Sequence, residues 1–144
     1  MKMFLSVAAV LIALLGCAWL IIPEAMLGRW SVQTNPVGLF MGRRYGTMLL
    51  GYAVILWLGR SSGPSMARTA ILAGGAFVTG LVTLVSIGGI ITDTVGPGAW
   101  VTVVIEALLT GGFLYFSLIG RVSSAAGELQ RQTAKAKQSE AERA

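Results

Sequence analysis

The sequence predicts an all-α polytopic membrane protein, a bundle of four transmembrane helices followed by a polar tail in the cytoplasm. Three observations predict this class. Hydrophobic residues make up 55% of the 144 residues, whereas charged residues make up 12%, about half the share of a soluble domain. Four apolar runs approach the length of about 20 residues that a helix needs to cross the hydrocarbon core. Positive residues gather at one set of run ends. An ordinary soluble domain, a disordered chain and a disulfide-stapled module are therefore excluded.

Four apolar runs define the expected spans, and turn signals separate them. Gly63-Pro64 and Gly96-Pro97-Gly98 interrupt the later runs, and Asn35-Pro36 offers a cap followed by proline at the first helical position. The first run continues past Cys17, which favours an uncleaved helix over a leader peptide. The expected spans are residues 4–22, 36–58, 69–91 and 99–119.

The polar tail and the charge distribution set the expected domain organisation and topology. Residues 1–120 form the expected transmembrane domain, and residues 121–144 form a charged tail, expected as a solvated helix or a disordered segment. A helix that contacts a partner or anionic lipid is the alternative for the tail. Four spans place both termini on one side, with eight of the eleven positive residues. The positive-inside rule then puts both termini in the cytoplasm.

The residue types that are missing limit the chemistry. The chain has no histidine and one cysteine, which excludes an internal disulfide, an ordinary zinc site, a histidine-ligated haem and a Ser-His or Cys-His catalytic pair within it. We therefore expect no metal and no cofactor. The net charge of +5 comes without an aromatic and basic surface stripe, so nucleic acid is not an expected partner.

Two arginines and one glutamate are predicted to lie at the same depth in the membrane. Arg43 and Arg44 follow Pro36 by seven and eight residues, roughly 10–12 Å along the helix. Glu106 follows Gly98 by eight residues, or about 12 Å. A charge at that depth is costly unless it reaches the interface or finds a partner. We expect an ion pair between Glu106 and one of the two arginines, and the sequence leaves open which one.

Hydroxyl side chains extend this expected pair into a polar site. Equal depths in the third and fourth spans match Ser86 with Thr102, Thr83 with Glu106, and Thr79 with Thr110. The site has a structural reading, in which the ion pair fixes helix register, and a functional reading as a headgroup site or a carboxyl that exchanges a proton. Its predicted members are Arg43, Arg44, Tyr52, Thr79, Thr83, Ser86, Thr102, Glu106 and Thr110.

Glycine spacing in the second span raises the question of oligomers. Gly42 and Gly46 form a GxxxG pattern around the arginines. The pattern indicates close helix packing, either within the chain or across a homodimer. Membrane lipids are the expected partners, with a homo-oligomer or a larger membrane complex as further alternatives.

The element Arg43-Arg44-Tyr45-Gly46, with a glutamate in the fourth span, is similar to one in small four-helix bacterial membrane proteins of unknown function. The wider sequence resembles the DoxX-like group. The resemblance implies the four-helix fold and a bacterial inner-membrane location, and it makes Arg44 and Glu106 residues of functional interest. It implies no settled activity.

Three functions fit the sequence. The first is a non-catalytic accessory or lipid-contacting bundle with a buried Arg-Glu pair. The second is a small proton-coupled transporter that uses Glu106. The third is a membrane enzyme acting on a lipid or quinone, which ranks last because the chain offers no evident nucleophile, redox centre or metal.

Overall fold

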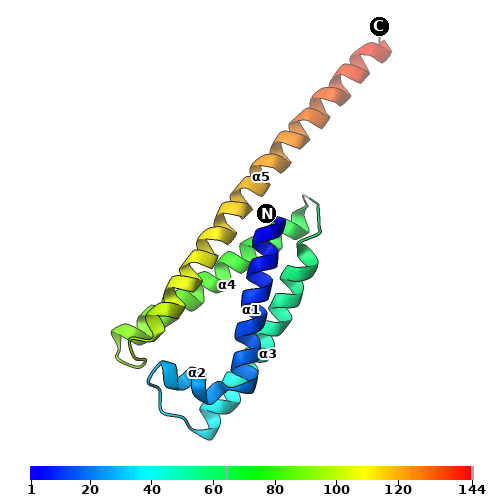
Figure 1. Ribbon diagram of the computed structural model, residues 1–144. Coiled ribbons are helices and arrows are strands. Elements are labelled where there is room, and N and C mark those ends of the chain that lie inside the picture. Colours follow the sequence, from blue (N-terminus) through cyan, green and yellow to red (C-terminus); the bar gives the residue numbers. More distant parts are fainter. Residues whose placement is uncertain (64, 144) are drawn as a thin grey trace.

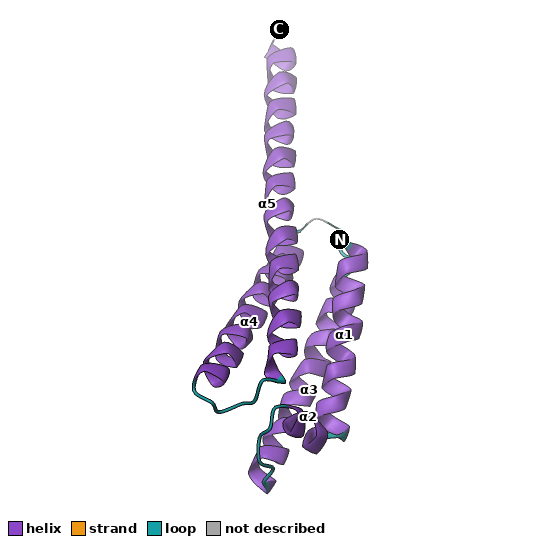
Figure 2. Ribbon diagram, turned by 60° about the vertical axis from the view of Figure 1, so that its left-hand side comes forward, coloured by secondary structure: helices purple, strands orange, loops and turns teal. Residues whose placement is uncertain are grey.

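The computed structural model describes residues 1–63 and 65–143, and the side chains of residues 1–63, 65–119, 132 and 133. Every regular element in this part of the chain is helical (Figures 1 and 2). The helices are α1 (Lys2–Ile21), α2 (Pro23–Arg29), α3 (Pro36–Gly59), α4 (Met66–Ile91) and α5 (Ala99–Arg143).

Side-chain caps fix the starts of α3 and α4. The Gly38 backbone N–H donates to Asn35 Oδ1 over 2.7 Å, and Pro36 occupies the first position of α3, as the sequence predicts. The Arg68 backbone N–H donates to Ser65 Oγ over 3.3 Å at the start of α4.

Two elements differ from expectation. The segment between the first two spans holds the short helix α2, which begins at Pro23 and packs this residue beside Gly42. Helix α5 does not end near residue 119 but continues to Arg143, over 45 residues and about 68 Å. Its last part extends beyond the other helices (Figure 1). The composition of the tail favours a helix but could not decide between helix and disorder.

The long helices form two antiparallel pairs, α1 with α3 and α4 with α5 (Figures 1 and 2). Glycine allows the first pair to approach closely, because a Cβ on Gly46 would lie 2.7 Å from the Gly16 carbonyl oxygen. A Cβ on Gly42 would lie 3.0 Å from the Trp19 ring. The GxxxG pattern therefore serves packing within the chain.

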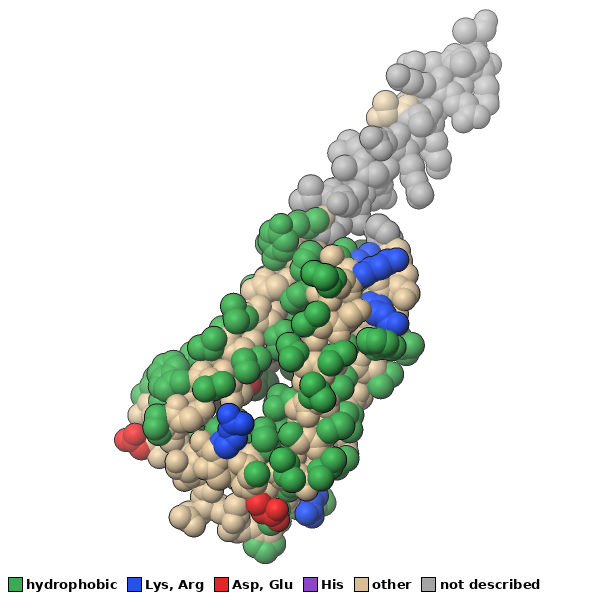
Figure 3. Space-filling view, viewed as in Figure 1, with side chains coloured by type: hydrophobic (Ala, Val, Ile, Leu, Met, Phe, Trp, Pro, Cys, Tyr) green, Lys and Arg blue, Asp and Glu red, His purple; other side chains and the backbone are tan. Residues whose placement is uncertain are grey.

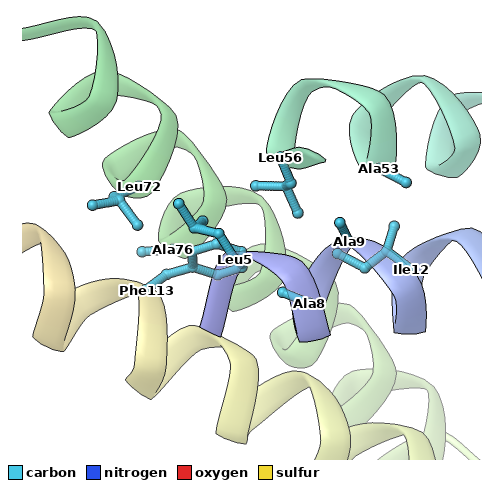
Figure 4. Close-up of a cluster of buried hydrophobic side chains, with 9 residues drawn as sticks. All are labelled: Leu5, Ala8, Ala9, Ile12, Ala53, Leu56, Leu72, Ala76 and Phe113. Atoms are coloured by element: carbon cyan, nitrogen blue, oxygen red, sulfur yellow. The ribbon is translucent and has the colours of Figure 1, made fainter. Parts of the chain in front are cut away.

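The two pairs contact each other near both of their ends. At the end that holds the N-terminus, they share a core of nine buried side chains (Figure 4). At the opposite end, the Gly96 N–H donates to the Trp30 carbonyl over 2.6 Å. Between these contacts the surface is hollowed (Figure 3). The core residues are Leu5, Ala8, Ala9, Ile12, Ala53, Leu56, Leu72, Ala76 and Phe113.

Three helices in the described part are long and apolar enough to cross a membrane. They are α1, α4 and the part of α5 from Ala99 to Ile119, with mean hydropathies of 2.6, 2.1 and 1.8. Helix α3 has 24 residues but carries Arg43 and Arg44, and it is not among them. These helices indicate a membrane protein.

Candidate functional site

The candidate site is centred on Glu106, which occupies an interior position of α5. Ala99, Val103, Phe113 and Ser117 are buried on the same helix, and together with Glu106 they follow one another at spacings of four, three, seven and four residues, which define one face. Glu106 falls within this pattern and is 8% exposed. An acidic side chain therefore occupies a position where an apolar side chain would normally pack.

Two neighbouring helices present polar groups to Glu106. The Ser86 hydroxyl on α4 donates a hydrogen bond to Glu106 Oε2 over 3.2 Å. Tyr45 on α3 is half-buried and lies close enough to the carboxylate to interact with it electrostatically. The Glu106 carboxyl group therefore bonds to α4 and interacts electrostatically with a residue of α3.

The expected ion pair is wrong for this structure. No basic nitrogen lies within 4.0 Å of the Glu106 carboxylate among the described side chains, and Arg43 and Arg44 are both exposed. Helical geometry gives the reason. Gly42 and Gly46 turn toward α1, and Arg43 lies about 200° around α3 from Tyr45, the α3 residue that interacts electrostatically with the acid. Residue counts give the depth of a side chain but not its direction.

Thr79 and Thr110 form the second polar contact between α4 and α5, as their equal depth predicts. The Thr110 hydroxyl lies 2.8 Å from Thr79 Oγ1, and the Thr79 hydroxyl donates to the Gly75 carbonyl over 2.8 Å. Thr110 Oγ1 also lies 2.8 Å from the Glu106 carbonyl oxygen. This contact lies one helical turn beyond Glu106 along α5.

The other expected pairings at equal depth are wrong. The Thr83 hydroxyl donates to the Thr79 carbonyl of its own helix over 2.8 Å, and Ser86, not Thr83, reaches Glu106. Thr102 is half-buried and has no side-chain hydrogen bond to any described residue. Ser86 and Thr83 are three residues apart and lie only about 60° apart around α4, so both are on one face, but only the Ser86 hydroxyl bonds the acid.

Tyr52 lies nearer the shared core than Glu106 does. Its hydroxyl is buried without a hydrogen-bond partner among the described residues and contacts Gly75 of α4. The Tyr52 and Phe113 ring centroids are 6.5 Å apart. Tyr52 thus packs where the two helix pairs meet.

Two residues of interest were not among the predicted site members. Tyr45 precedes Tyr52 by seven residues, a spacing that places both on one face of α3, so this signal was available. Arg68 is 9% exposed, and its Nε is buried without a partner in the described part. In the sequence, the position of Arg68 next to the start of an apolar span indicated only a role in setting the membrane topology.

An apolar groove lies on another face of the α4–α5 pair. Its volume is about 490 Å³. Thr83 and Thr110 contribute hydroxyls, and the other lining residues are Ala76, Phe77, Gly80, Leu81, Leu84 and Ala107. The groove therefore favours a hydrocarbon chain or an apolar side chain.

The site chemistry is that of a lone carboxyl group. No group of three or more Cys, Asp or Glu side chains able to hold a metal occurs in the described part of the chain. Glu106 can bind and release a proton, accept hydrogen bonds or balance a cation. Tyr45 and Tyr52 add aromatic surface suited to cations.

Fold and site together define an α-helical protein of two helix pairs with one acid between them and three helices able to span a membrane. The chain belongs to the family named Domain of unknown function (DUF8292), whose model matches residues 6–140. No curated protein and no solved structure matches the chain.

Proposed function

We propose that this chain is an integral membrane protein with four spans that acts as a small proton-coupled carrier of a cationic, partly apolar substrate. Glu106 is the group that exchanges a proton for the substrate. The observation that carries this proposal is the burial of the Glu106 carboxyl, with a hydroxyl donor at 3.2 Å and no basic group within 4.0 Å among the described residues.

The fourth span in this proposal is α3. It runs antiparallel to α1 and packs against it through Gly42 and Gly46, so it lies at the same depth as an apolar helix. The exposed side chains of Arg43 and Arg44 are long enough to reach the headgroup region from within the first turns of the helix. Eight of the eleven positive residues then lie on the side of the termini, which supports cytoplasmic termini in a bacterial inner membrane.

Coupling follows from the cost of a buried charge. A carboxylate held away from water without a cation is strongly disfavoured. A proton that leaves Glu106 is therefore replaced by a cation, and an arriving proton displaces that cation. Tyr45, on the face of α3 that also carries Tyr52, gives an organic cation an aromatic surface near the acid.

Access to the site follows from the contacts between the two helix pairs. Each pair is tightly packed, whereas the pairs meet at the shared core and at the loop contact of Trp30 with Gly96. Opening one of these contacts while the other holds exposes Glu106 to one side of the membrane at a time. The hollow between them (Figure 3) is the proposed substrate position.

The test uses tetraphenylphosphonium, an apolar organic cation, and the full chain purified in detergent. Addition of the cation to the wild-type protein in weak buffer should release about one proton per bound cation, read with a pH-indicator dye. Glu106→Gln should abolish both release and binding. Asp93→Asn, which neutralises an exposed acid in the α4–α5 loop, is the matched control and should behave as wild type. A folded Glu106→Gln protein that binds the cation and releases protons normally would contradict the proposal.

A lipid-contacting accessory bundle is the second candidate, and the apolar groove favours it. A groove of about 490 Å³ suits an acyl chain. In this case Glu106→Gln would leave bound lipid unchanged, whereas Gly80→Leu, which fills the groove beside Thr110, would reduce the lipid that co-purifies in native mass spectrometry.

A further inference from the structure

A second charged group is buried at the other end of the helix pair. Arg68 lies in the first turn of α4 and is 9% exposed. Its Nε is buried and has no hydrogen-bond partner among the described residues. A guanidinium carries five N–H donors and no acceptor. A buried donor without an acceptor is costly, so an anion that accepts from this Nε would stabilise the protein.

The side chain of Arg68 enters the end of the bundle. Leu72, Gly75, Ala76 and Thr79 are the other buried residues of α4, and Arg68, Leu72, Gly75 and Thr79 follow one another at spacings of four, three and four, which define one interior face. This end also holds the N-terminus and the α3–α4 connection (Figure 1). Arg68 therefore lies where the interior of the bundle meets the membrane surface.

The described part of the chain supplies no counter-ion at this end. Asp93 follows Arg68 by 25 residues, which corresponds to about 37 Å along the helix direction, and Glu24 lies on α2 beyond the far end of α1. Other cations lie at the same end as Arg68. The Arg60 guanidinium stacks 3.3 Å from the Trp57 ring centroid, and Lys2 begins α1. Aromatic side chains such as Trp57 favour the headgroup level.

We propose that Arg68 binds the phosphate group of an anionic molecule at this end of the bundle. The planar guanidinium matches phosphate oxygens in two-point hydrogen bonding, and the buried Nε is one of the donors. Anionic phospholipid and free phosphate share this chemistry, and a phospholipid would bring the phosphate to the depth of Arg68 with its chains along the exposed apolar helices.

The experiment measures ligand binding to the full chain purified in detergent. Phosphatidylglycerol, phosphatidylcholine and inorganic phosphate are each titrated, and binding is followed by thermal shift and native mass spectrometry. We expect phosphatidylglycerol to raise the unfolding temperature and to remain bound, and phosphatidylcholine to do neither. Arg68→Gln should weaken phosphatidylglycerol binding roughly tenfold or more, since charged hydrogen bonds are lost. Arg60→Gln is the matched control at the same end and should retain wild-type binding.

The outcomes distinguish the two possible sources of the anion, and they also show which result would overturn the proposal. A response to inorganic phosphate that needs Arg68, without one to phosphatidylglycerol, supports a soluble anion at the same site. Equal responses to phosphatidylglycerol and phosphatidylcholine with none to phosphate overturn the proposal, and this comparison needs only the wild-type protein. If Arg68→Gln does not fold, Arg68→Lys keeps the charge but loses the planar fork, and unchanged affinity in this variant also overturns the proposal.

Discussion

Ser86 on α4 donates a hydrogen bond of 3.2 Å to the Glu106 carboxylate on α5, so the buried acid is held by the helix pair to which it belongs. The alternative, a guanidinium from α3, would tie the two pairs together between their end contacts. The observed contact instead leaves the pairs joined near their ends, which is the arrangement that the proposed carrier mechanism uses.

Removal of the Ser86 hydroxyl should destabilise the α4–α5 pair. We expect Ser86→Ala to lower the free energy of unfolding by about 0.6–1.7 kcal/mol, the range for hydrogen bonds between membrane helices. The measurement is reversible unfolding of the detergent-solubilised protein in dodecyl sulfate.

Thr83→Val is the matched control for this loss, because the Thr83 hydroxyl donates to a carbonyl of its own helix. It should change the free energy by less than about 0.5 kcal/mol. In a double-mutant cycle, Ser86→Ala should cost less in a Glu106→Gln background than alone. Strict additivity would show that the two residues do not interact.

Neutralisation of the paired arginines should have little effect on stability. Arg43 and Arg44 are exposed, and exposed substitutions away from special features usually change stability by within about 0.5 kcal/mol. We expect this for Arg43→Gln and Arg44→Gln in the same unfolding assay. If either substitution instead raised the free energy of unfolding of Glu106→Gln by more than about 1 kcal/mol, an ion pair between that arginine and Glu106 would be the correct description.

The helical elements were largely predictable because their signals are local. Asn35 and Pro36 fix the start of α3 whatever surrounds them, and Gly96-Pro97-Gly98 lies in the connection between α4 and α5. The continuation of α5 through the polar tail was not predictable, because composition allows both a helix and a disordered chain.

The sequence predicted the depth of the candidate site residues along their helices but not which side chains contact each other. Counting residues brought Thr79 level with Thr110, and they do bond. The same counting brought Arg43 level with Glu106, but Arg43 points away because Gly42 turns its own face toward α1. Which helix face meets which neighbour depends on packing between distant segments, and a single sequence does not show it.

Close packing of α1 against α3 should depend on Gly46. A methyl group there would lie 2.7 Å from the Gly16 carbonyl oxygen and 2.9 Å from the Leu20 nitrogen, and backbone atoms move aside only with the helix. We expect Gly46→Ala to lower the free energy of unfolding by about 1–3 kcal/mol.

Gly51 on the same helix is the control for this substitution, since a methyl group there meets nothing within 4 Å. Gly51→Ala should be neutral or stabilising by up to about 1 kcal/mol, because alanine favours the helix. Equal losses in both variants would show that α1 and α3 do not approach as closely as described.

At the contact between Tyr52 and Gly75, substitutions of the two residues should change the free energy of unfolding in opposite directions. The Tyr52 hydroxyl is buried without a hydrogen-bond partner among the described residues, so Tyr52→Phe should be neutral or stabilising by up to about 1 kcal/mol. Gly75→Ala places a methyl group against that hydroxyl and 2.9 Å from the Phe113 ring, and should destabilise by about 1–3 kcal/mol. The double variant should recover part of this loss, because removal of the hydroxyl frees space for the methyl group.

Gly74→Ala, with nothing within 4 Å of the added methyl group, is the control and should not destabilise. A loss of more than about 1 kcal/mol in Tyr52→Phe would mean that the hydroxyl has a hydrogen-bond partner, such as a buried water, and that the junction of the helix pairs is hydrated.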